Sequence, residues 1–185
     1  MVLDIPEINL SFTREGTLLS EEWQNTTWQD TKDILKSQGM AMLTPFQFRA
    51  VLRYLRDSQE YQELYKDIIE VRDPWKAERL NAKFEKREDG MYMISEDALI
   101  NNKYENQILK LDDCLMQDRS ISLDEWLDST TPHGLPPANI STGDLFYWSP
   151  INKHVAGFDA NAASRVYLCC DGSPGNLNES SFRRW

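Results

Sequence analysis

Large apolar residues alternate with residues of no common chemistry along the C-terminal part of the chain, residues 143–185. The apolar ones recur at spacings that suit a β-sheet with one buried face: Phe146, Trp148, Val155, Phe158, Val166 and Leu168. Between them stand Lys153, His154, Gly157, Asp159, Arg165, Tyr167 and Asp171. The pattern predicts strands over residues 145–148 and 165–170 with turn-rich joins between them. A fixed scaffold under a chemically unconstrained face is more typical of a recognition surface than of an enzyme pocket.

Helical spacing of apolar residues dominates an earlier part of the chain. Thr27 and Asp30 predict the capped start of a helix of about three turns, which ends at Gly39. Thr44-Pro45 predicts the start of a second helix, because a capping threonine precedes a proline at the first helical position. Its apolar stripe is Phe48, Val51, Leu52 and Leu55. A third helix has its apolar residues at Tyr61, Leu64, Tyr65 and Ile68 and is ended by Asp73-Pro74.

The spacing changes to that of a β-hairpin after residue 75. Apolar residues alternate over residues 80–84 and again from Met91, and a turn at Gly90 separates the two runs. We expect loops with short elements over residues 97–120, and one capped helical turn over residues 122–127.

Turn-forming residues predict three further irregular segments. We expect an extended lead-in over residues 1–25 with a turn at 13–17, a proline-rich connection over 130–137 and a loop over 171–178. Helices come first and an irregular antiparallel sheet comes later, so the predicted class is α+β.

Composition and charge exclude several classes of protein. The chain has 185 residues, of which 41% are hydrophobic and 11% aromatic, and this predicts one folded domain spanning residues 1–185. The net charge of −10 argues against nucleic acid as a partner. The sequence contains no run of eighteen apolar residues and no secretory signal, so we expect no membrane insertion and take the cytoplasm as the default location.

The three cysteines do not form a disulfide framework. They are Cys114 and the adjacent pair Cys169-Cys170, and neighbouring cysteines bridge only with strained geometry. In a strand the two adjacent side chains point to opposite faces, which predicts that Cys170 is buried and that Cys169 is an exposed thiol. The spacings of zinc ligands are absent, so no metal site is predicted.

The sequence offers few candidates for catalysis. His133 lies in a loop near prolines and His154 in the segment of mixed chemistry, and we expect both at the surface. Ser141 and Ser149 lack the Gly-x-Ser-x-Gly context of a hydrolase, and no phosphate loop or dinucleotide motif occurs. We therefore predict no catalytic residue, no metal and no cofactor.

Four segments together resemble a known family. Gly143-Asp-Leu-Phe-Tyr-Trp-Ser-Pro150, Val155-Ala-Gly-Phe-Asp-Ala160, Leu168-Cys-Cys170 with Pro174, and the upstream Glu70-Val-Arg-Asp-Pro-Trp75 are similar to the variable proteins of diversity-generating retroelements, the archaeal type in particular. In such systems an error-prone reverse transcriptase randomises adenines while it copies a template repeat into the 3′ end of the target gene. Adenine-rich codons then encode arbitrary residues, while the other codons stay fixed.

The resemblance implies a C-type lectin fold of the kind found in formylglycine-generating enzymes, without the motifs of calcium-dependent sugar binding, and a role in recognising a ligand through residues 143–185. By position in the motif, the variable, ligand-facing residues, here called the variable set, are Ile151, Lys153, His154, Gly157, Asp159, Asn161, Ala162, Ala163, Arg165, Tyr167, Cys169, Asp171, Gly172, Ser173, Gly175 and Leu177. The fixed positions, here called the frame residues, are Val155, Phe158, Val166, Leu168 and Cys170. The implied partner is a macromolecular ligand, with a protein favoured.

The sequence also departs from the family. Related chains continue after the Ser180-Ser181 pair with a further strand, whereas Phe182-Arg-Arg-Trp185 ends this sequence. One alternative function remains open, because formylglycine-generating oxidases share the related fold and use cysteines, which here would be Cys169 and Cys170. A structural role in a capsid or fibre is compatible with ligand recognition.

Overall fold

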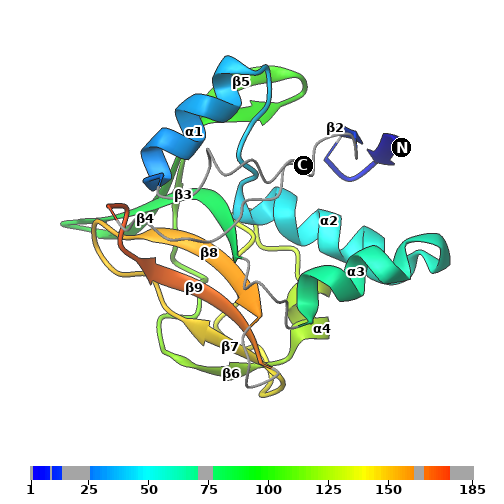
Figure 1. Cartoon of the computed structure of the whole chain (residues 1–185). Helices are drawn as coiled ribbons and strands as arrows, with labels where there is room; N and C mark the ends of the chain where they lie inside the picture. The colour runs from blue at the N-terminus through cyan, green and yellow to red at the C-terminus, as the bar shows by residue number, and fades with distance from the viewer. Residues whose placement is uncertain (1, 9, 14–25, 71–76, 161–164, 176–185) are drawn as a thin grey trace.

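A computed structural model describes residues 2–8, 10–13, 26–70, 77–160 and 165–175, and they form an α+β structure. Its largest element is a sheet of seven strands in the order β5-β4-β3-β8-β9-β7-β6, and Figure 1 shows the helices arranged around it. A separate antiparallel pair is formed near the N-terminus by β1 (Val2–Ile5) and β2 (Leu10–Thr13). The chain turns between these two strands at residues 6–8, and most of the predicted turn at 13–17 lies outside the described residues.

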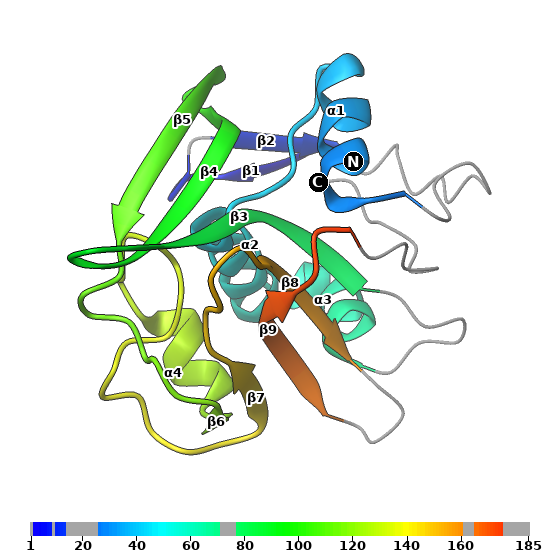
Figure 2. The same ribbon diagram turned by 90° about the vertical axis from the view of Figure 1, so that its left-hand side faces the viewer.

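The predicted hairpin is present and is longer than expected. It consists of β3 (Ala77–Arg87) and β4 (Gly90–Ile100), which pair antiparallel. A third strand, β5 (Lys103–Lys110), pairs with β4, so the prediction of loops over residues 97–120 is wrong for its first half (Figure 2). β5 was not predicted because it lies at the edge of the sheet. Its side chains are mostly exposed there, so they show no alternation of apolar and polar residues.

The C-terminal strands complete the sheet and make it mixed. They are β6 (Arg119–Ile121), β7 (Leu145–Trp148), β8 (Val155–Ala160) and β9 (Val166–Gly172). β8 was predicted as part of a turn-rich join, and β9 continues two residues into the predicted loop. Because β7 runs parallel to β9, the expectation of an antiparallel sheet is also wrong. Residues 176–178 of that predicted loop lie outside the described residues.

All four predicted helical segments are present. α1 (Trp28–Ser37) and α2 (Pro45–Asp57) begin with complete capping boxes at Thr27 and Thr44. A short 3₁₀ turn (Gln59–Tyr61) leads into α3 (Gln62–Ile69), and Ser122 caps α4 (Leu123–Asp128). The residues predicted to end α3, Asp73-Pro74, lie outside the described part of the chain.

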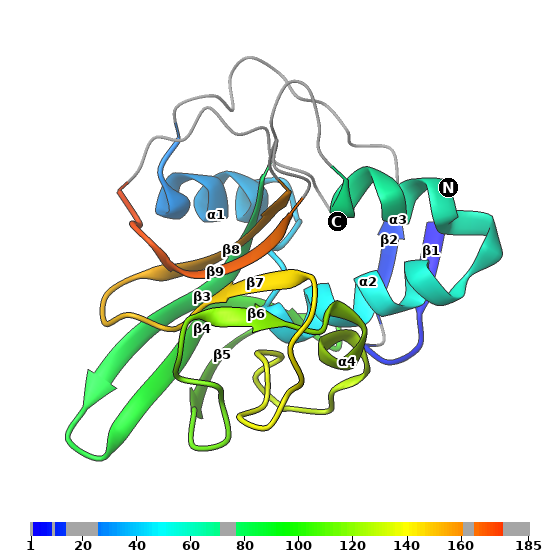
Figure 3. The same ribbon diagram turned by 90° about the horizontal axis from the view of Figure 1, so that it is seen from below.

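The helices lie on two sides of the sheet, as the view in Figure 3 makes visible. α2 and α4 contribute Phe48 and Trp126 to the main core, whose rings lie 5.0 Å and 5.9 Å from the ring of Phe158 on β8. α1 instead packs over the other face, where Trp28, Leu35, Met42 and Val155 form a second apolar cluster. The C-terminal strands are therefore buried from one side along their length and covered by α1 only at one end.

His133 was predicted at the surface, but it is fully buried. Its Nδ1 accepts a hydrogen bond from the backbone N–H of Leu135 at 3.0 Å, so its Nε2 carries the proton and donates to Asp113 at 2.9 Å. Burial lowers the pKa of His133, and the bond to Asp113 partly opposes that shift. The neutral imidazole thus connects the 130–137 loop to Asp113. The proline-rich sequence around His133 does not indicate that this side chain is buried.

We predict that this histidine makes stability fall in mild acid. Its pKa in the folded chain lies below the ordinary 6.5, so the unfolded chain binds more protons as the pH falls through that region. The stabilisation is complete above about pH 6.5 and is lost as the pH drops through the lower folded value. Urea unfolding at several pH values should show this loss. His133→Gln should lower the unfolding free energy at neutral pH by roughly 1–3 kcal/mol and remove this part of the slope. Equal slopes for both chains would contradict the prediction.

Candidate functional site

The outward side of β7, β8 and β9 forms one continuous surface, here called the C-terminal face. It contains Phe146 and Trp148 of β7, Gly157 and Asp159 of β8, and Tyr167, Cys169 and Asp171 of β9. Tyr167 pairs with Phe146 on one side and with Asp159 on the other, and Cys169 pairs with Trp148 and Gly157. Directly paired residues point to the same side of a sheet, so the paired side chains share one face. The pairing of β8 with β9 is irregular at Asp171, which lines the same depression as Gly157, Asp159 and Cys169. Each residue of the C-terminal face is half-buried or exposed.

Every described member of the variable set is at least partly accessible to solvent. Ile151, Lys153, Arg165, Ser173 and Gly175 are exposed. The half-buried members are His154, Gly157, Asp159, Tyr167, Cys169, Asp171 and Gly172. Asn161, Ala162, Ala163 and Leu177 lie outside the described residues. The described members gather on β8, β9 and the turns beside them.

The frame residues are all buried, but not all in the same place. Phe158, Val166, Leu168 and Cys170 point into the main core beneath the C-terminal face. Val155 has the same parity as Gly157 and Asp159, so it lies on the outward side, and Trp28 of α1 covers it there. The burial of Val155 therefore depends on α1, which is far from β8 in the sequence.

Phe146 and Trp148 were predicted on the buried side of the sheet, but they lie on its outward side. Leu145 and Tyr147 occupy the core instead, both with no exposed surface, and Trp148 is 36% exposed. The rings of Phe146 and Trp148 lie 4.9 Å apart, and the ring of Tyr167 lies 6.2 Å from that of Phe146. All four residues of β7 are apolar or aromatic, so no alternation of apolar and polar residues identifies the outward pair.

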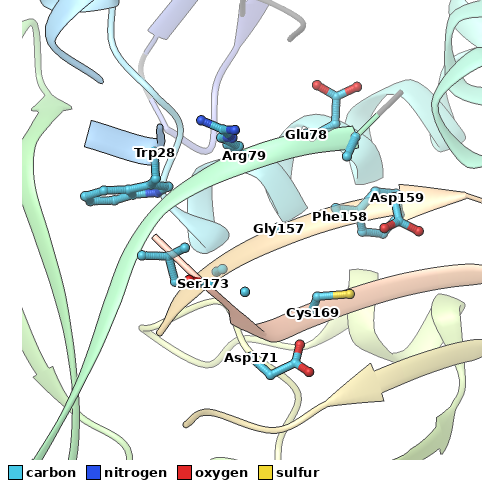
Figure 4. Close-up of a pocket in the computed structure, with 13 residues that line it drawn as sticks. Trp28, Glu78, Arg79, Gly157, Phe158, Asp159, Cys169, Asp171 and Ser173 are labelled. Carbon is cyan, nitrogen blue, oxygen red and sulfur yellow. The ribbon is translucent and has the colours of Figure 1, made fainter. Parts of the chain in front are cut away.

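A depression of about 200 Å³ opens where the C-terminal face meets α1. Figure 4 shows Trp28 and Ser173 at one end of it and Asp159 at the other, with Cys169 between them. Six members of the variable set contribute to its lining: Gly157, Asp159, Cys169, Asp171, Gly172 and Ser173. Trp28 and Arg79 were not among the predicted site residues, because they come from α1 and β3.

Contacts between α1, β3 and β9 fix the rim of this depression. The indole N–H of Trp28 donates to the carbonyl of Leu80 at 2.9 Å, and its backbone N–H donates to the carbonyl of Pro174 at 3.2 Å. Arg79 donates to the hydroxyl of Thr31 at 3.0 Å, and burial lowers its pKa to about 10 while Asp30 opposes the shift. The guanidinium is still charged at neutral pH, and it is held towards α1.

Cys169 and Cys170 point to opposite sides of β9. Cys170 is completely buried, whereas Cys169 is half-buried, so the expectation of an exposed thiol is wrong. Burial raises the pKa of both thiols, and the nearby carboxylates Asp159 and Asp171 raise that of Cys169 further. Both groups are therefore protonated at neutral pH. A nucleophilic or metal-binding thiolate pair would need the opposite shift.

Across residues 2–8, 10–13, 26–70, 77–160 and 165–175 no group of three or more His, Cys, Asp or Glu side chains is arranged to hold a metal ion. His154, at the edge of the face, directs its Nδ1 to the carbonyl oxygen of Asn152 at 3.0 Å. The face presents aromatic rings, carboxylates and a thiol that can contact a partner.

Backbone geometry limits substitution at some members of the variable set. Lys153 has a φ of 67°, a conformation that costs an ordinary L-residue roughly 1–2 kcal/mol. A Cβ added at Gly172 would lie 3.0 Å from the carbonyl oxygen of Val155, and one at Gly157 would lie 3.3 Å from that of Glu78. A Cβ at Gly175 would meet nothing within 4 Å.

We predict that two glycines of the variable set differ in their tolerance. Gly172→Ala should destabilise the chain by roughly 1–3 kcal/mol, because the new methyl group presses on the backbone of β8. Gly175→Ala is the matched control and should stay within about 0.5 kcal/mol of the unsubstituted chain. Urea unfolding of the three proteins measures both values. Equal stability of the two variants would show that β8 and β9 separate easily and that the frame is less rigid than its packing implies.

Comparisons of the chain with models of protein families, with curated proteins and with solved structures found no match. None of the helices in the described part of the chain is both long and apolar enough to cross a membrane.

Proposed function

We propose that the chain is a non-catalytic binding protein that recognises a macromolecular ligand, with a protein favoured, through its C-terminal face. The observation that carries the proposal is the division of β8 and β9 into two sides. Phe158, Leu168 and Cys170 are buried almost completely, while Asp159, Tyr167 and Cys169 on the opposite side remain accessible. A scaffold whose stability comes from one side can change the residues on the other side without unfolding.

The finer parts of the proposal rest on the sequence motifs. We propose a C-type lectin fold for the α+β structure and diversification of the variable set by a retroelement. The accessible positions on β8 and β9 support this reading, since the described members of the variable set coincide with them. The surrounding DNA provides an independent test. A nearby imperfect repeat of the codons for residues 150–180, differing only at adenines and next to a reverse-transcriptase gene, is expected.

An oxidase of the formylglycine-generating type is the competing function. It requires two cooperating thiols, and the opposite orientations of Cys169 and Cys170 together with the raised pKa of each favour binding instead. A copper- or oxygen-dependent activity that disappears in Cys169→Ser would decide for the oxidase.

The binding function predicts that outward residues contribute little to stability. Tyr167→Ser combined with Asp159→Ala should change the melting temperature by only a few degrees, because both side chains are only half-buried. Leu168→Ala is the matched control on the same strand and should cost roughly 2–5 kcal/mol, since Leu168 is fully buried. Calorimetry or thermal unfolding by circular dichroism measures both. A loss in the double variant as large as that in Leu168→Ala would refute the proposal.

A further inference from the structure

β5 forms one edge of the seven-stranded sheet, and its outer side has no strand partner in the described part of the chain. Figure 2 shows it along the outer border of the described structure. The strand is eight residues long and contains no proline. The irregularity in its pairing falls between Ser95 and Ala98, where β4 has the extra residue, so β5 itself is regular. Such an edge can pair with another strand unless its side chains prevent this.

The backbone groups that β5 turns outward follow from its hydrogen bonds. The N–H of Leu111, directly after the strand, donates to the carbonyl oxygen of Met91 on β4 at 2.9 Å. Along an antiparallel strand, successive residues direct their N–H and C=O groups alternately to the two sides. Tyr104, Asn106 and Ile108 therefore present their backbone N–H and C=O groups to the outer side of β5.

The side chains of the same three residues share one side of the sheet, because they are spaced two residues apart. Tyr104 and Ile108 are 39% and 54% exposed, although both are large and apolar. Tyr104 has a fixed orientation, since its hydroxyl donates to the carbonyl oxygen of Met40 at 3.0 Å. Two exposed apolar side chains thus lie at equal distances along the strand on either side of Asn106.

This symmetric spacing makes the strand complementary to an antiparallel copy of itself. With Asn106 opposite the Asn106 of a second copy, Tyr104 of each chain lies opposite Ile108 of the other, and aromatic residues pair well with β-branched ones across strands. Glu105 then lies opposite Gln107, so no like charges are directly opposed. Moving the axis to residue 105 would place Glu105 opposite itself, and moving it to residue 107 would separate Tyr104 from Ile108.

We propose that β5 joins two copies of this chain edge to edge, with the two-fold axis at Asn106, so that the two sheets become one. The three outward-facing residues of each strand exchange about six backbone hydrogen bonds, because each hydrogen-bonded antiparallel pair exchanges two. β4 and β3 separate β5 from β8 and β9, so the C-terminal face of each chain stays outside the contact. This inference goes beyond the proposed binding function and does not depend on it.

Sedimentation velocity of the full chain measures this self-association. The contact is small, so we expect a weak dimer with a Kd on the order of 10–100 µM. The samples span concentrations from well below to well above that range. Each copy carries a net charge of −10, and salt screens the repulsion between them, so the dimer should tighten as the ionic strength rises.

A lysine on the edge strand should prevent the pairing. Ile108→Lys should weaken dimerisation about tenfold or more, because a charged side chain then replaces the apolar contact with Tyr104 of the other copy. Met116→Lys is the matched control, since Met116 is also exposed, at 43%, but stands three residues before β6 at the opposite edge of the sheet. It should leave the Kd within about twofold. The melting temperature of each variant is measured alongside.

Disulfide trapping tests the register without replacing Tyr104 or Ile108. Glu105 of one copy lies opposite Gln107 of the other as a non-hydrogen-bonded pair, whose Cα atoms are about 4.5 Å apart and within reach of a disulfide. An equal mixture of Glu105→Cys and Gln107→Cys chains should therefore form a cross-linked dimer under mild oxidation. Each variant alone should form far less, because copies of one position are two residues out of register. The unsubstituted chain controls for its own cysteines.

A chain that stays monomeric throughout the concentration range would refute the dimer. A dimer that persists in Ile108→Lys, or that weakens equally in Met116→Lys, would place the second copy elsewhere and refute the contact through β5. Cross-linking of either single variant as strong as that of the mixture would refute the axis at Asn106. If Ile108→Lys lowers the melting temperature, the cross-linking of the mixture decides instead. None of these results bears on recognition through the C-terminal face, which has its own test.

Discussion

The packing of Phe158 between two helices is the contact on which the C-terminal face depends. Its ring lies against Phe48 of α2 and Trp126 of α4, and this fixes β8 in the middle of the sheet. Since β9 pairs with β8, and β7 pairs with β9, the position of one strand fixes the other two. An accessible face can then carry unrelated side chains, because apolar burial on the opposite side supplies the stability.

The helices and the hairpin could be predicted from the sequence, because the residues that start and end them are close neighbours along the chain. Thr27 and Thr44 form caps within three residues of themselves, and the turn before Gly90 needs only its immediate neighbours. The burial of Phe158 and Leu168 was predictable for a similar reason, because each is a large apolar residue with smaller or polar neighbours. These features require no knowledge of which segments meet in space.

Three other features could not be predicted from the sequence, because they depend on contacts between segments that are far apart along the chain. Every residue of β7 is apolar or aromatic, so only its pairing with β9 decides that Trp148 faces outward and Tyr147 inward. His133 is buried because Asp113 and the backbone of Leu135 satisfy both ring nitrogens, and such partners are invisible in a one-dimensional pattern. Trp28 belongs to the candidate site only because α1 folds back over β8.

The candidate site is bordered on one side by α1 and on the other by aromatic residues of β7. Trp28 covers Val155 and bonds to the carbonyl of Pro174, so α1 ties down the end of β9. On the opposite side stand the rings of Phe146 and Trp148. Apart from those at Gly157 and Gly172, substitutions between these borders change the chemistry of the surface but hardly its outline, because the flanking elements are held by contacts of their own. In the proposed binding function, charge and side-chain shape would therefore select the partner on a surface whose backbone stays constant.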